Sequence, residues 1–176
     1  MGRELDRDVA EARFRAVFAH LGAVTAYARR RGSTDPAGIA AETMTIAWRR
    51  LRDVPEDDPL PWLLATGRNL VWAEARRARR AGGDPADDAV TTPAPEFFEL
   101  DPDLAAALMA LSPSDREALL LVAWEDLTPA GAAAALGISG PTFRVRLLRA
   151  RRRLRARLAE ARPDDVPPAH FAVEGS

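Results

Sequence analysis

Eight arginines lie between Arg144 and Arg157 with no acidic residue among them, and leucines interrupt this run at helical spacing. A helix of this composition is apolar on one side and cationic on the other. Arginine pairs with phosphate and can donate two hydrogen bonds to the edge of a guanine, so such a face can bind nucleic acid and read its sequence. The alternative for any run of charge is a solvated surface helix, and the residues before this run decide between the two.

A short segment of small residues, "AGAAAALG", precedes the arginine-rich stretch and leads into it through the turn "GIS". Thr128 and Pro129 suit the start of a first helix, Gly137 suits its end, and Ser139 can cap the next helix. This pattern is typical of a helix-turn-helix, whose second helix enters the DNA major groove. On that helix we expect Phe143, Leu147, Leu148 and Leu154 to face the core, and Thr142, Arg144, Arg146, Arg149 and Arg153 to lie on the exposed side.

Other kinds of chemistry lack the residues they require. The sequence has no cysteine and two histidines, so disulfides and thiolate chemistry are excluded, and a transition-metal site would need an unusual set of carboxylates. "GISG" does not have the spacing of a nucleophile elbow, and no glycine-rich phosphate loop follows a strand. We therefore expect no enzymatic activity, no cofactor and no metal.

The sequence also favours a cytoplasmic location. The N-terminal residues are too charged for a signal peptide, and the longest apolar run, Ala118 to Trp124, is about a third of a membrane span. We expect no insertion into a membrane.

An acidic, proline-rich segment divides the chain into two parts. Between Asp84 and Asp103 there are seven acidic residues and no basic one. Such a composition buries little apolar surface, which predicts a flexible linker. We expect a first domain over 8–81, a linker over 82–102, a second domain over 103–160 and a mobile tail over 161–176.

Both domains are predicted to be small and helical, which makes the fold all-α. Apolar residues recur at steps of three and four, and no segment alternates with a period of two for long enough to form a strand. In the first domain the pattern predicts a helix over 14–28, a second from Asp35-Pro36 to about Leu51, and a third over 61–80, with a loop at 53–61. Tryptophans 48, 62 and 72 lie at helical spacing among leucines and alanines, which favours core positions over platforms for stacking bases.

In the second domain, Ser112 and Pro113 are predicted to begin a helix that runs through "REALLLVAW", and a further helical segment precedes it from about Asp103. With the two helices of the helix-turn-helix, this domain reads as a compact helical unit.

Several motifs, taken in order, resemble the sigma-70 family of RNA polymerase sigma factors. "AWRRL", "PWLLATGRN" and "RRARR" resemble region 2, and "SPSDREALLL", "ALGIS" and "RLLRARRRL" resemble region 4. The resemblance covers about 14–158. Because an acidic linker stands where a region 3 is lacking, the chain is similar to the extracytoplasmic-function (ECF) group. The resemblance implies transcription initiation without chemistry of its own, with core RNA polymerase, promoter DNA and an anti-sigma factor as partners.

The resemblance also implies roles for individual residues. Region 2 of the family melts the minus-ten element and holds a flipped base between a loop, here 53–61, and the following helix, with a cationic stretch along the DNA backbone. The matching residues are Arg68, Asn69, Arg76, Arg77 and Arg80 for the minus-ten element; Ser139, Thr142, Arg144, Val145, Arg146 and Arg149 for the minus-thirty-five element; and Asp35, Glu42, Trp48 and Arg49 for core polymerase.

Two departures from the family leave alternatives open. Gly38 and Ala41 stand where an aspartate and a glutamine help to bind core polymerase, so this surface is weakened or rebuilt. One alternative is a sigma mimic, an interaction module that captures an anti-sigma factor, although an intact arginine-rich face argues against it. The other is a stand-alone helix-turn-helix regulator, against which the match at 61–80 argues. Phe143 and Val145 stand where valine and serine are common, which leaves the promoter sequence unpredicted.

Overall fold

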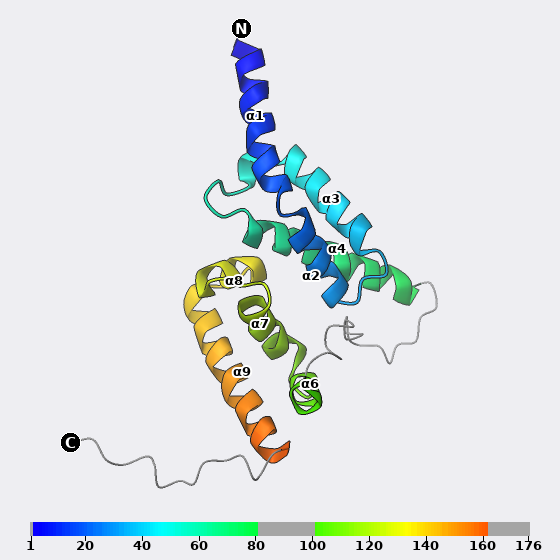
Figure 1. The fold of residues 1–176 in the computed structure, drawn as a ribbon, viewed down its shortest axis with the longest axis vertical. Coiled ribbons are helices and arrows are strands. Elements are labelled where there is room, and N and C mark those ends of the chain that lie inside the picture. The colour runs from blue at the N-terminus through cyan, green and yellow to red at the C-terminus, as the bar shows by residue number, and fades with distance from the viewer. Residues whose placement is uncertain (1, 81–100, 162–176) are drawn as a thin grey trace, which may run out of the picture.

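The computed structural model describes residues 2–80 and 101–161 (Figure 1). In these residues the regular elements are all helical, which confirms the all-α prediction. The first part contains α1 (Gly2–Phe18), α2 (Leu21–Arg30), α3 (Pro36–Arg49), the 3-10 turn η1 (Leu51–Asp53) and α4 (Leu60–Arg80). The second part contains α6 (Pro102–Met109), α7 (Pro113–Ala123), α8 (Pro129–Leu136) and α9 (Gly140–Ala161).

The single helix predicted over 14–28 is wrong, because the chain bends between α1 and α2. The backbone N–H of His20 donates to the carbonyl oxygen of Val17, three residues earlier, at 3.1 Å. This bond closes a tighter turn than the four-residue step of an α-helix, and α1 ends here. The bend lets α2 pack against both α3 and α4, while α1 packs against α3 (Figure 1). Val17 and Val24 are both buried, so the apolar periodicity continues across the bend and conceals it.

The other predicted helices of the first part are confirmed with small changes at their ends. Asp35 caps α3 by accepting a hydrogen bond from the Gly38 N–H at 2.9 Å, and Pro36 occupies the first turn. Leu51 lies in η1 instead of in α3, and α4 begins at Leu60, so the loop between them follows the prediction closely.

Local start and stop signals place every helix of the second part. The side chain of Ser112 accepts from the Asp115 N–H at the start of α7, and that of Thr128 accepts from the Gly131 N–H at the start of α8. Gly137 ends α8 at a φ of 65°, a left-handed conformation that glycine adopts without a steric penalty. Ser139 accepts from the Thr142 N–H at the start of α9, so the predicted helix-turn-helix is present as α8 and α9.

One continuous core joins the two parts of the chain. Val24 and Leu63 of the first part belong to the same buried cluster as Leu121 and Phe143 of the second. Helix α8 packs against α4, and this contact brings the two parts side by side (Figure 1). Most of the predicted linker and all but the first residue of the predicted tail lie outside the described residues.

Three apolar side chains that were predicted to be in the core are exposed. Leu148 is 70% exposed, because the buried stripe of α9 passes through Phe143, Leu147 and Ala150 and leaves Leu148 outside it. Trp48 and Trp72 are 46% and 43% exposed, whereas Trp62 is partly buried and packs against the core. The core therefore contains fewer tryptophan side chains than the spacing predicted. No helix among the described residues is long and apolar enough to cross a bilayer.

Candidate nucleic-acid interface

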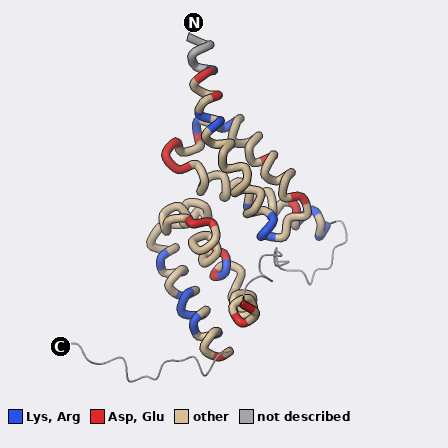
Figure 2. Tube along the Cα trace, in the orientation of Figure 1, with Lys and Arg blue, Asp and Glu red and all other residues tan. Residues whose placement is uncertain are grey.

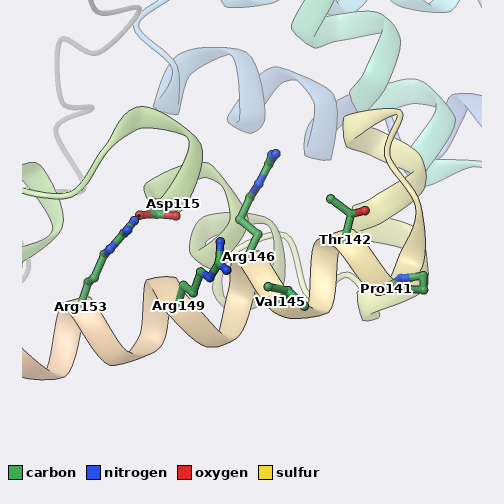
Figure 3. A pocket seen from close by; sticks show the side chains of 7 residues that line it. All are labelled: Asp115, Pro141, Thr142, Val145, Arg146, Arg149 and Arg153. Carbon is green, nitrogen blue, oxygen red and sulfur yellow. Dashed lines mark hydrogen bonds and ion pairs between the residues drawn. The ribbon is translucent and has the colours of Figure 1, made fainter.

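The outer face of α9 gathers most of the predicted minus-thirty-five residues. Thr142, Val145, Arg146 and Arg149 line a hollow of about 490 Å³ together with Pro141, Arg153 and Asp115 of α7 (Figure 3). Successive members are three or four positions apart, which puts them on one stripe of the helix. Arg144 is exposed but lies off this stripe, so the structure separates it from the other predicted readers.

The N-terminal end of α9 is built from two hydroxyl side chains. Ser139 and Thr142 are hydrogen-bonded through their hydroxyl oxygens at 2.7 Å, and both are exposed. The N-terminal end of a helix carries a partial positive charge, which favours phosphate binding. This end of α9 therefore has the chemistry to hold a DNA backbone beside the arginine stripe.

Arg153 does not belong to the free cationic face where the sequence placed it. Its Nη1 atom donates to Oδ2 of Asp115, a side chain that is 7% exposed at the start of α7 (Figure 3). The pair ties α9 to α7 and fixes the orientation of the arginine stripe. Sequence reasoning missed Asp115; its position in the first turn after Ser112-Pro113 marks a helix start but does not reveal its partner.

Positive charge runs along α9 (Figure 2). Among the described residues, no ion pair involves Arg144, Arg146 or Arg149. These guanidinium groups therefore remain available for an anionic partner.

The predicted minus-ten residues on α4 fall into two groups. Asn69, Arg76, Arg77 and Arg80 are exposed. Arg68 is partly buried instead: its Nη2 atom lies 3.5 Å from the carbonyl oxygen of Leu136, and its guanidinium group lies 4.7 Å from the ring centroid of Trp72. The structure thus places Arg68 under the C-terminal end of α8, apart from the open surface of α4.

The loop before α4 is held from both sides. Arg13 donates to the carbonyl oxygen of Val54 at 2.6 Å and pairs with Glu56 at 2.9 Å. At its other end, a Cβ atom added to Gly131 of α8 would lie 3.1 Å from Cγ of Pro61, so α8 approaches α4 closely at this point. The loop therefore has a defined position beside α8.

The predicted polymerase-binding residues lie along α3. Glu42, Trp48 and Arg49 are exposed, and the seven-residue step from Glu42 to Arg49 puts these two on one face. The carboxylate of Asp35 is occupied by capping, and a Cβ atom added to Gly38 would lie 2.0 Å from its Oδ2 atom. A glycine at position 38 therefore leaves room for the capping carboxylate of Asp35.

Trp48 also borders an apolar hollow between α1 and α3 that sequence reasoning missed. The hollow measures about 570 Å³, and its walls include Phe14, Phe18 and Met44. Phe18 is 47% exposed. No group of three or more His, Asp or Glu side chains in the described part of the chain is placed to hold a metal ion.

Comparison with known proteins identifies the family. The family model for sigma-70 region 4 matches residues 103–154, which contain α7, α8 and most of α9. A probable RNA polymerase sigma factor, RfaY of Xanthomonas campestris pv. campestris, is 34% identical over 134 residues. The chain belongs to the sigma-70 family. The match covers 69% of this chain and 34% of RfaY, so the sigma-70 chain described here spans about a third of the length of that relative.

Two solved structures share the fold of this sigma-70 family member. One is CnrH in complex with the cytosolic domain of CnrY, at a TM-score of 0.58 and 28% identity, covering 84% of this chain and 88% of CnrH. The other is the sigma factor RpoE in complex with the anti-sigma factor NepR from Bartonella quintana, at a TM-score of 0.59 and 26% identity, covering 86% and 97%. Both matches extend over the two parts of the chain, in agreement with the two-domain form of the ECF group.

Proposed function

We propose that this chain is an ECF-type sigma factor, which binds core RNA polymerase and directs promoter recognition, DNA melting and transcription initiation. The observation that carries the proposal is the arginine stripe of α9, the second helix of the helix-turn-helix, within the residues that match region 4. In this proposal 8–81 serves as region 2, 103–160 as region 4, 82–102 as the acidic linker and 161–176 as a tail.

Region 4 would bind the minus-thirty-five element through α9. Ser139 and Thr142 would contact phosphate at the N-terminal end of the helix, where the partial positive charge of the helix dipole adds to the attraction. Arg146 and Arg149 would enter the major groove, where a guanidinium group can donate two hydrogen bonds to guanine. Val145, which is 48% exposed and lines the same hollow, can contact a thymine methyl group.

Region 2 would bind the minus-ten element as single-stranded DNA. The amide of Asn69 offers both a donor and an acceptor to the edge of a flipped base. Arg76, Arg77 and Arg80 would hold the backbone of the same strand electrostatically. Nothing in this mechanism requires catalysis by the chain, because nucleotide addition is the reaction of the polymerase.

Two protein partners follow from the same proposal. Core polymerase would dock on α3, at Asp35, Glu42, Trp48 and Arg49. An anti-sigma factor is the second partner, supported by the similarity to RpoE, whose structure was determined in complex with the anti-sigma factor NepR. A protein with these partners acts in the cytoplasm.

Binding to purified core RNA polymerase tests the proposal directly. We expect the full chain to be retained by immobilised core polymerase, and the Trp48→Ala/Arg49→Ala variant to be retained less. A matched control, Arg157→Ala, removes an arginine from the far end of α9 and should be retained normally. Absence of binding by the parent chain would contradict the proposal and favour the sigma-mimic alternative, in which an anti-sigma factor is the sole partner.

A further inference from the structure

A cluster of five ionisable side chains joins the two parts of the chain. Arg30 and Arg31, at the C-terminal end of α2, face Glu117 of α7 and Glu125 just after it. Arg31 donates to Glu117 at 3.1 Å and to Glu125 at 2.8 Å, and Arg30 donates to Glu125 at 2.5 Å and 3.2 Å. The hydroxyl of Tyr27 donates to Glu117 at 3.1 Å, and the Arg31 guanidinium lies over the Tyr27 ring.

Burial makes this cluster different from a surface ion pair. The side chains of Arg31 and Glu125 are 7% and 3% exposed, and that of Arg30 is 12% exposed. Burial and the neighbouring Glu117 carboxylate raise the pKa of the Tyr27 phenol far above its usual range, so the phenol stays protonated and donates. Two cations face two anions, which neutralises the cluster, and separating the two parts would leave each charge without its partner.

The cluster is reinforced by the contact between α8 and α4. Gly131 allows α8 to approach Pro61, and the carbonyl oxygen of Leu136 lies against Arg68. Arg68 is one of the residues predicted to reach the minus-ten base, yet in this arrangement α8 covers it. The same contact that completes the core therefore hides part of the proposed DNA surface.

We propose that Arg30, Arg31, Glu117 and Glu125 form a latch that holds the two domains closed, and that the latch must open before Arg68 can contact DNA. The second half of this statement rests on the proposed function, whereas the first half concerns the conformation alone. No residue of the latch lines the hollow beside the arginine stripe, so the latch would restrain region 2 while leaving the α9 face open.

The test measures the distance between the two domains in the full chain. Because the sequence has no cysteine, the exposed Ala37 of α3 and Ala156 of α9 can be changed to cysteine and spin-labelled as a pair. The parent should give one narrow distance distribution at the separation of the closed structure. Glu117→Gln/Glu125→Gln keeps the side-chain shapes and removes both negative charges, and it should raise the open population by about tenfold or more.

Two further variants guard against misfolding and general charge effects. Glu160→Gln removes an exposed carboxylate that pairs with Arg157, and it should leave the distribution unchanged. Gly131→Leu opens the interface by steric conflict with Pro61 and leaves the four charged residues of the latch unchanged, and it should also shift the distribution to longer distances. Far-UV circular dichroism should show parent helicity in all three. A closed distribution in Glu117→Gln/Glu125→Gln, or an open one in the parent, would overturn the latch.

Binding to a random-sequence single-stranded DNA oligonucleotide separates the latch from the function. If opening exposes the minus-ten surface, both opened variants should bind the oligonucleotide about tenfold more tightly than the parent, and Arg68→Ala should reverse the gain. If the opened variants bind the oligonucleotide no more tightly than the parent, the latch is still supported, but the role assigned to Arg68 is contradicted.

Discussion

The arginines of α9 and those at the end of α2 have the same side-chain chemistry but different surroundings. Arg146 and Arg149 border an open hollow, while Arg30 and Arg31 are enclosed by carboxylates from the other part of the chain. Side-chain type does not explain why one pair is open and the other enclosed, because each pair consists of arginines close together in the sequence, on or at the end of a helix. The difference lies in the acidic residues that the fold brings to them, so an arginine is available for binding only where no carboxylate forms an ion pair with it.

Arg153 lies between these two cases. Its side chain is 60% exposed, yet it pairs with Asp115, which is almost fully buried. The three kinds of arginine, enclosed, half-enclosed and open, predict a graded series of mutational effects.

The largest effect is expected from Arg31→Met. This change leaves the buried Glu125 and the partly buried Glu117 with a single remaining cation, Arg30, so the free energy of unfolding should fall by about 3–5 kcal/mol. Urea unfolding followed by circular dichroism measures it. A loss as small as that of an exposed pair would mean that the cluster is solvated in solution and that the contrast with α9 is false.

The next largest effect is expected on the affinity for promoter DNA, with no change in the free energy of unfolding. Arg146→Ala and Arg149→Ala should each weaken binding to the cognate promoter fragment by about 1–3 kcal/mol, because each removes a guanidinium from the stripe. Fluorescence anisotropy with the polymerase holoenzyme, on promoter and random DNA, measures the loss. Arg144→Ala is the matched control; off the stripe, it should mainly reduce the salt dependence. Equal losses on both DNAs for Arg146→Ala and Arg149→Ala would show that these residues do not read sequence.

An intermediate effect on stability is expected from Arg153→Ala. It leaves the buried Asp115 carboxylate without its ion-pair partner, at a cost of about 1–2 kcal/mol to the free energy of unfolding. The companion variant Asp115→Asn/Arg153→Ala removes the unpaired charge and should recover part of this loss. If the single change costs nothing, the pair does not position α9.

The smallest effect is expected from Arg157→Ala. Arg157 and its partner Glu160 are both more than half exposed, and solvent screens such a pair. The free energy of unfolding should change by about 0.5 kcal/mol or less, measured by the same urea titration. A larger loss would show that exposure does not rank the arginines of this chain.

Sequence reasoning succeeded where the physical signal is local. Ser112, Thr128, Gly137 and Ser139 mark the ends of helices through hydrogen bonds or backbone conformations that involve residues within about one helical turn. These signals located the helix-turn-helix and, with it, the face of α9 that forms the candidate site.

Features that depend on distant residues could not be predicted in the same way. Arg31 and its partners Glu117 and Glu125 are 86 and 94 positions apart, and nothing near any of them in sequence specifies the pairing. Leu148 has the apolar character of a core residue, but the stripe of α9 that meets α6, α7 and α8 leaves it exposed. The covered position of Arg68 has the same origin, because it depends on where α8 rests.

Run-off transcription with reconstituted polymerase tests the central claim most directly. Core polymerase with the parent chain is given a pool of genomic fragments from the source organism, and transcript starts are mapped by sequencing. A sigma factor predicts starts clustered behind a shared two-part motif, with Arg146→Ala/Arg149→Ala losing the upstream part of that preference. Transcript starts no different from those of core polymerase alone would contradict the account.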